Sequence, residues 1–178
     1  MERTCENGVV SNSAPVVVTG AATGIGRAVA RRLVGDGRSV VAVGRRNAPL
    51  EALNAELGDL LGVVVADVAT TAGAEKVAEH IAQLGRGCAG VVACAGGRSP
   101  GGPGTLEEIR ADWQSTFESN VLTAVLTVEA LKPALTSSAG RVVLLSSIAA
   151  LRGSGSGPYG AVKSALHAWM LDLARILG

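Results

Sequence analysis

Residues 16–26, which read VVVTGAATGIG, decide the fold of this chain. The β-branched run Pro15–Thr19 is typical of a buried parallel strand, and it stops at Gly20. Apolar residues within Ile25–Val34 then recur at helical spacing. Glycines between such a strand and such a helix let the backbone turn sharply and approach a phosphate closely, because no Cβ stands in the way. The stretch therefore predicts the first βα unit of a dinucleotide-binding domain.

The same alternation continues along the chain. Four further strands are expected at residues 39–43, 62–66, 90–94 and 141–145. Helices are expected at residues 49–57 (capped by Asn47), 71–84, 106–135 (one helix or two in series) and 158–177. Parallel strands joined by helices require right-handed crossovers. We therefore predict an α/β fold, a doubly wound parallel sheet of the Rossmann type with strand order 3-2-1-4-5.

Composition and charge exclude several classes of protein. Hydrophobic residues make up 48% of the 178 residues and aromatics only 2%, so the core must be built from Val, Ala and Leu. A formal net charge of +1 offers no basic face for nucleic acid. The longest apolar runs are far short of the roughly 20 residues that span a bilayer. We expect residues 1–14 to form a loose arm and residues 15–178 to form one domain.

Cysteines and histidines give no sign of a metal site. Cys5, Cys88 and Cys94 show no CxxC spacing, which favours reduced thiols and a cytoplasmic location. His80 and His167 are too far apart in the sequence to suggest a metal, and each is expected on a helix at the surface or at a rim. The N-terminus lacks the basic start and apolar core of a signal peptide.

The glycine spacing of residues 19–26, TGxxxGIG, resembles the fingerprint of the short-chain dehydrogenase/reductase family, and specifically of the members similar to 3-oxoacyl-[acyl-carrier-protein] reductases. The resemblance implies that the turn binds the pyrophosphate of a nicotinamide cofactor at the N-terminus of the following helix. The residues that it assigns to this role are Thr19, Gly20, Thr23, Gly24, Ile25 and Gly26.

The cofactor choice is expected at the end of the second strand. Enzymes that prefer NAD usually place a carboxylate there, about 20 residues after the turn, to bind the ribose 2′-hydroxyl. Here Gly44 is followed by Arg45 and Arg46, whose guanidinium groups can pair with a 2′-phosphate. The alternative is two solvated arginines that lead into a loop. The sequence favours NADP(H), with NAD(H) as the second choice.

Two further segments resemble cofactor-binding motifs of the family. Asp67 and Val68 follow the third strand and resemble the family's adenine-side pair, although an acidic residue at this point can also be a helix cap. Ala95 and Gly96 follow the fourth strand and resemble the last two residues of the family's Asn-Ala-Gly turn. Cys94 stands where asparagine is usual, and a thiol is a poor hydrogen-bond former. We therefore expect the turn to persist without the asparagine's bracing role.

Tyr159 and Lys163 lie four residues apart, on one face of the last predicted helix. A phenol in water ionises only near pH 10, and a neighbouring ammonium favours the phenolate. Tyr159 is the only tyrosine of the chain, and it follows a serine pair at the distance that the family shows. The pair resembles the family's catalytic Tyr and Lys.

The catalytic serine is Ser147 or Ser146. The strand-end pattern favours Ser147, twelve residues before Tyr159, whereas the family's commoner spacing of thirteen would select Ser146. We prefer Ser147 because a shortened Gly/Ser loop can absorb one deleted residue. Successive strand residues face opposite ways, so only one of the two can face the site.

The resemblance implies a role for each of these residues. Tyr159 is the general acid/base, Lys163 stabilises its ionised form and binds the nicotinamide ribose, and Ser147 hydrogen-bonds the substrate oxygen. Asn120, in the predicted long helix, positions a water that relays protons. The implied reaction interconverts a carbonyl and an alcohol, in a homodimer or homotetramer.

Family members ordinarily continue with two more strands and a segment that covers the substrate. We expect C-terminal sequence to be missing, with a natural short form as the alternative. A cofactor-binding protein without turnover, or an epimerase or dehydratase of the extended family, also fits the motifs. The apolar positions Leu122, Leu126, Ala130, Leu166, Met170 and Leu173 suit a subunit interface or packing on the sheet.

Overall fold

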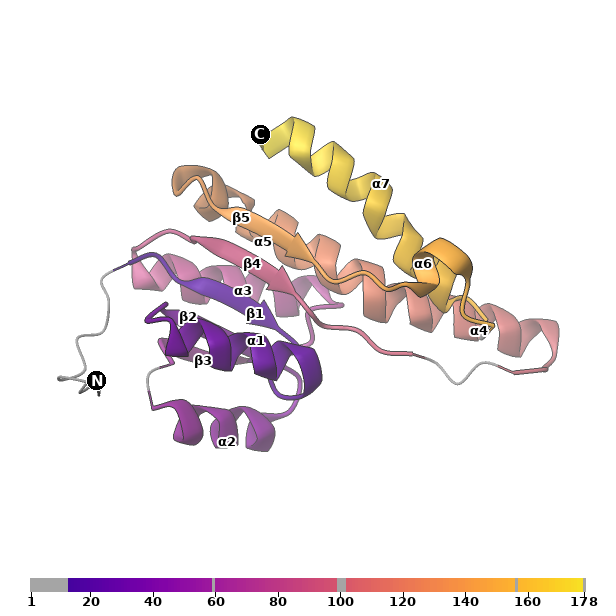
Figure 1. Cartoon of the computed structure of the whole chain (residues 1–178), viewed down its shortest axis with the longest axis horizontal. Helices are drawn as coiled ribbons and strands as arrows, with labels where there is room; N and C mark the ends of the chain where they lie inside the picture. Colours follow the sequence, from indigo (N-terminus) through magenta and orange to yellow (C-terminus); the bar gives the residue numbers. More distant parts are fainter. Residues whose placement is uncertain (1–12, 59, 99–101, 156, 178) are drawn as a thin grey trace, which may run out of the picture.

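The computed structural model describes residues 13–58, 60–98, 102–155 and 157–177, so the expected arm at residues 1–14 lies almost entirely outside the described residues. Five parallel strands form one sheet in the order β3-β2-β1-β4-β5, as predicted (Figure 1). Their bounds are Val16–Thr19 (β1), Val40–Gly44 (β2), Gly62–Val65 (β3), Gly90–Ala93 (β4) and Arg141–Leu144 (β5).

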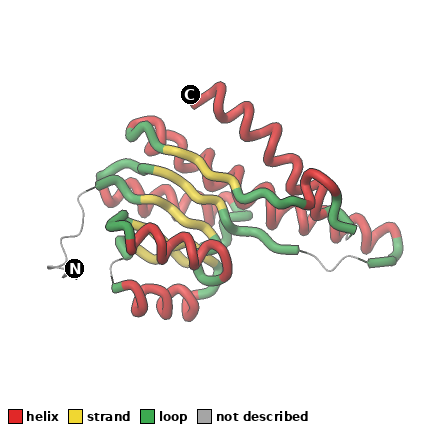
Figure 2. The backbone as a smooth tube through the Cα atoms, in the orientation of Figure 1, coloured by secondary structure: helices red, strands yellow, loops and turns green. Residues whose placement is uncertain are grey.

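Helices cover both faces of the sheet (Figures 1 and 2). Their bounds are Gly24–Gly35 (α1), Asn47–Leu57 (α2), Thr71–Leu84 (α3), Leu106–Phe117 (α4), Thr123–Ser137 (α5), Ala149–Arg152 (α6) and Tyr159–Leu177 (α7). A π-helical turn, η1 (Glu118–Leu122), joins α4 to α5, so the predicted 106–135 segment is two helices in series. α1 and α2 lie on one face, and α3, α5 and α7 lie on the other.

The sheet is buried on both faces at its centre, which is why its strands read as continuous valine runs. Val16 and Val18 point toward α1 and α2, together with Leu50 of α2. Val17 and Val91 point the other way, into the core that α3, α5 and α7 complete. At the sheet edge the burial ends: β5 leaves Val143 53% exposed.

Two local expectations were wrong. The residue that caps α2 is Arg46 rather than Asn47, because the helix already includes Asn47 in its first turn. The short helix α6 was not predicted, since four residues are too few to show a helical period. Among the described helices, none combines the length and the apolar character that crossing a membrane requires.

Candidate active site

A cleft of about 610 Å³ opens at the carboxyl ends of the strands, where ligands bind in open α/β sheets. Its walls come from the turns after β1, β2, β3 and β4 and from the helical segment around η1. Eight of the predicted cofactor residues line it: Gly20, Thr23, Arg45, Arg46, Asp67, Val68, Ala95 and Gly96.

The β1–α1 turn depends on glycine. Gly20 has φ +66° and Gly24 has φ +54°, in the left-handed region that favours glycine. A Cβ on Gly26 would collide with the carbonyl of Gly20, and a Cβ on Gly20 would come within 3.0 Å of the Ala95 nitrogen. Gly24 begins α1, so the free N–H groups of the helix face the cleft end of the turn.

The other predicted turn residues shape this loop rather than line the cleft. Thr19 is fully buried, and its Oγ1 accepts a hydrogen bond of 3.0 Å from the Ala95 N–H. Ile25, which the sequence assigns to the cofactor, is exposed on α1.

The ends of β2 and β3 supply the charged wall of the cleft. Arg45 and Arg46 are both exposed there, and no side chain caps the N-terminus of α2 at Arg46. Across the cleft, Asp67 accepts a hydrogen bond of 3.1 Å from the Ala69 N–H, which closes a turn, and Val68 beside it is buried. Two cations and one carboxylate therefore face the same space.

Asn120 holds the turn after β4. Its Nδ2 donates to the Gly97 carbonyl at 2.8 Å, and its Oδ1 accepts from the Gly97 N–H at 3.2 Å. A Cβ on Gly96 would come within 2.6 Å of the same Oδ1. Asn120 is 1% exposed and lies within η1. The turn thus persists with Cys94 in place of asparagine, held by Thr19 at one peptide and by Asn120 at another.

Lys163 lies at the same turn. Its Nζ donates to the Leu145 carbonyl at 2.9 Å and lies 3.4 Å from where a Cβ on Gly96 would stand. The residue is only 4% exposed. Burial lowers the pKa of the Lys163 ammonium below its ordinary value, and the ionised thiol of Cys94 opposes this shift. Burial likewise raises the pKa of the Cys94 thiol, with Lys163 opposing.

The remaining catalytic candidates are Tyr159 and Ser147, and among the described residues neither makes a hydrogen bond to this turn. Tyr159 is the half-buried first residue of α7, one turn before Lys163, and its hydroxyl has no hydrogen-bond partner among the described residues. Ser147 accepts a hydrogen bond of 3.2 Å from the Ala149 N–H. Ser146 instead bonds to His167 of α7 at 2.7 Å. Of the four predicted catalytic residues, Asn120 and Lys163 meet at one turn.

Sequence reasoning missed part of the site. Arg98 lines the cleft after β4, and the opposite wall carries polar residues of α4, η1 and α5, namely Ser115, Glu118, Ser119 and Thr123. The i, i+3 and i+4 spacing of these wall residues was the available signal. No sequence signal connected His167 to Ser146.

Fold and cleft together define a Rossmann-type α/β protein with an open cleft at the carboxyl ends of its strands. The family described as "short chain dehydrogenase" matches residues 14–178, and the chain belongs to it. Serine 3-dehydrogenase of Agrobacterium fabrum is 34% identical over 165 residues, which are 90% of this chain and 65% of that protein. NADP-dependent 3-hydroxy acid dehydrogenase YdfG of Salmonella typhimurium is 30% identical over 163 residues, 89% of this chain and 64% of that protein.

Solved structures of other proteins show the same similarity. A closed form of serine dehydrogenase complexed with NADP+ has a TM-score of 0.81 at 28% identity and covers 92% of this chain and 66% of its own. L-sorbose reductase from Gluconobacter frateurii, complexed with NADPH and L-sorbose, has a TM-score of 0.82 at 28% identity, over 93% of this chain and 64% of its own. The chain thus spans about 65% of the length of the curated relatives that it matches.

We predict that Gly26→Ala lowers the free energy of unfolding by about 1–3 kcal/mol, because the added Cβ meets fixed backbone of the β1–α1 turn. Urea unfolding followed by circular dichroism measures it. Gly35→Ala is the control: it lies at the end of the same helix with open space around its Cβ. Equal losses in the two variants would contradict the close approach.

A second prediction concerns pH. Because the folded-state pKa of Lys163 is below its unfolded value, the unfolded chain binds more protons between the two values. The free energy of unfolding therefore rises with pH through the folded-state pKa and levels off above the ordinary lysine value. Lys163→Met should reduce this rise in urea titrations at a series of pH values. Lys132→Met is the control: this lysine of α5 pairs with Glu129 and is not buried, so its replacement should leave the rise in unfolding free energy with pH in place. An unchanged rise in Lys163→Met would contradict the prediction.

Proposed function

We propose that the chain binds NADP(H) and carries the catalytic residues of an oxidoreductase that interconverts a carbonyl and an alcohol. The observation that carries the proposal is the cleft at the strand ends, which a glycine turn and a pair of arginines line, with the buried Lys163 at the turn after β4 that forms part of its wall.

The cleft fits a nicotinamide dinucleotide part by part. The Gly20 turn and the start of α1 suit a pyrophosphate, because backbone N–H groups and the helix dipole favour negative charge there. Arg45 and Arg46 suit the 2′-phosphate that distinguishes NADP from NAD. Asp67 and Val68 suit the adenine. Relatives named for NADP, and structures complexed with it, support the same choice.

The proposed residues act on a proton while the cofactor, when bound, supplies or accepts the hydride. In alcohol oxidation the ionised oxygen of Tyr159 would accept the O–H proton of the substrate. In carbonyl reduction Tyr159 returns that proton. Lys163 stabilises the ionised Tyr159 and binds the ribose, and Ser147 donates to the substrate oxygen. Asn120 commits its side chain to Gly97, so we assign it the positioning of that turn.

Hydroxy acids and their keto forms are the proposed substrate class. The relatives' names include serine 3-dehydrogenase and 3-hydroxy acid dehydrogenase, whose substrates are alcohols that carry a carboxylate. Arg98, at the cleft wall, offers a cation for such a carboxylate. A 3-oxoacyl thioester, which the sequence motifs also suit, remains the second substrate to test.

One observation favours a different function. Ser147, Tyr159 and Lys163 do not line the cleft itself, whereas the cofactor residues do. A protein that binds the cofactor without turnover would need only the latter. Binding of NADPH without oxidation of any hydroxy acid, by this chain and by a longer natural form, would select that function.

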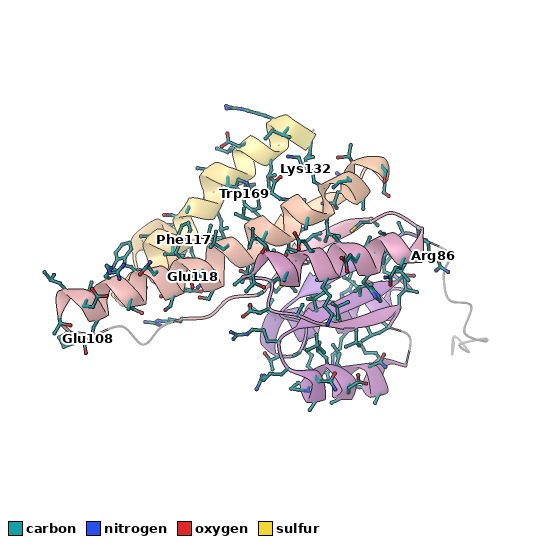
Figure 3. All side chains as sticks on the ribbon, turned by 180° about the vertical axis from the view of Figure 1, so that it is seen from behind. Arg86, Glu108, Phe117, Glu118, Lys132 and Trp169 are labelled. Atoms are coloured by element: carbon teal, nitrogen blue, oxygen red, sulfur yellow. The ribbon has the colours of Figure 1, made fainter. Side chains whose placement is uncertain are left out.

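We also propose a cytoplasmic homo-oligomer. Cys88 and Cys94 are free thiols, which suits a reducing compartment. α4 runs out beyond the sheet, with Glu108 near its outer end (Figure 3), and exposes an apolar stripe at Leu106, Ile109, Trp113 and Phe117. Leu166 and Leu173, which the sequence also offered for an interface, are in the core instead.

Light scattering should give a dimer or tetramer that Trp113→Lys dissociates, because a charge would then stand within the apolar stripe of α4. A monomeric parent chain would refute the proposed homo-oligomer.

The cofactor choice gives the sharpest test. Replacing both arginines, Arg45→Ala and Arg46→Ala, removes charge-assisted bonds to a 2′-phosphate, each worth about 1.5–3 kcal/mol. The two bonds together are worth about 3–6 kcal/mol, so the Kd for NADPH should rise by at least about 100-fold while the Kd for NADH changes little. Calorimetric titration of both cofactors measures it.

Arg38→Ala is the matched control, because this exposed arginine precedes β2 and lies at the opposite end of that strand from the cleft. It should leave both Kd values unchanged. Equal weakening of NADPH and NADH by the double variant would contradict 2′-phosphate recognition. Failure of a longer natural form to bind either cofactor would refute the proposed function.

A further inference from the structure

Residues 145–153 follow β5 and precede the loop before α7; we call this segment the strap. The strap packs against α7 at three points. Lys163 donates to the carbonyl of its first residue, Leu145. α6, within the strap, lies so close to α7 that a Cβ on Gly160 would come 2.7 Å from the Ala149 carbonyl. A third fastening is the bond between Ser146 and His167. The strap carries Ser147, and α7 carries Tyr159.

Ser146 is bound on two sides by α7. Its Oγ lies 2.7 Å from His167 Nε2 and 3.3 Å from the Lys163 carbonyl, one helical turn away. A hydroxyl can donate once and accept twice. It can therefore donate to the Lys163 carbonyl while it accepts from the Nε2–H of His167, or donate to an unprotonated Nε2. In the first arrangement both bonds form and together set the height and the rotation of the strap on the helix; in the second the bond to His167 alone holds Ser146.

Holding Ser146 leaves Ser147 available. Its Oγ accepts from the Ala149 N–H, and its own proton has no acceptor among the described residues. That proton is the one that a substrate oxygen requires as a hydrogen-bond donor. Ser147 is thus oriented by its anchored neighbour and by the bond that it accepts from Ala149, while its proton stays available for the substrate oxygen.

We propose that His167 and Ser146 form a positioning pair that holds the strap on α7 and thereby fixes Ser147 relative to Tyr159 and Lys163. The inference rests on the proposed oxidoreductase function. It assigns the two neighbouring serines different roles, with Ser147 facing the substrate and Ser146 facing the helix.

The same bond could suggest a Ser–His nucleophilic dyad, but the surroundings do not support one. Both polar contacts of the Ser146 hydroxyl are to α7. A hydroxyl that donates to the Lys163 carbonyl cannot at the same time give its proton to His167, which attack by Ser146 would require. The bond therefore acts in positioning rather than in attack.

Four variants test the pair: Ser146→Ala, His167→Leu, their double mutant, and His167→Gln, whose amide can reach the position of Nε2. The probe reaction is oxidation of L-serine and 3-hydroxypropionate with NADP+. We expect the first two variants to lose about 10- to 100-fold in kcat, because a small misplacement of a reacting group is costly. The Kd for NADP+ should stay within about 2-fold, since the strap lies outside the phosphate turn.

Coupling and rescue separate positioning from general destabilisation. The double mutant should be no worse than either single mutant, because both remove the same bond. His167→Gln should recover most of kcat. Ser164→Ala, on the same helix with only a bond to the Ala161 carbonyl, is the control and should behave as the parent. A loss in Ser146→Ala as large as that in Ser147→Ala would overturn the division of roles.

Hydrogen exchange makes the test independent of turnover. The amides of Ala150, Leu151 and Gly153 are hydrogen-bonded within the strap, so its loosening is measurable. Exchange should be faster in Ser146→Ala and His167→Leu and normal in His167→Gln and Ser164→Ala. Unchanged exchange in the first two overturns the proposal. If the parent chain binds no cofactor, the proposed function has failed, and exchange alone then decides whether the pair holds the strap.

Discussion

Three backbone segments converge at the carboxyl ends of β1 and β4, and this convergence is the constraint on which the rest of the structure depends. Gly26 approaches the carbonyl of Gly20, Gly20 approaches the peptide of Ala95, and Gly96 approaches Asn120. A side chain at any of these glycines would separate two elements that the sheet register holds together. These close approaches, two of them between backbone segments and one to the Asn120 side chain, hold the turns that form the floor of the cleft.

The turn after β4 is exposed to the cleft at Gly96 and Gly97 but is held from the protein side. Thr19 and Asn120 pair with its peptide groups, and the π-helical turn η1 brings the asparagine there. Such turns within helices often occur at functional sites. Beside this turn Lys163 is itself buried, and this burial lowers the pKa of its ammonium. One packing arrangement thus produces both the shape of the cleft floor and the electrostatics of its lysine.

The sequence was sufficient for the parts governed by local pattern. Valine runs and helical periodicity identified all five strands and the long helices, and glycine spacing identified the first turn. Features that depend on tertiary contact escaped it. The bond between Ser146 and His167 joins residues 21 apart, and the wall at Arg98 forms only once the chain has folded. The four-residue helix α6 makes little more than one helical turn, so its sequence cannot show a repeating pattern.

The choice between the two serines shows why counting residues is not enough. The distance from a serine to Tyr159 can be twelve or thirteen, because the glycine-rich loop between them changes length without changing the strand that precedes it. β5 ends at Leu144, so both serines lie beyond the strand, and the contacts of each determine where it faces. Ser146 bonds to His167 of α7, whereas Ser147 accepts from the Ala149 N–H within the strap. Under the proposed positioning role of His167, the serine available to a substrate is the one that α7 does not hold, and the loop length records only how the chain returns to Tyr159.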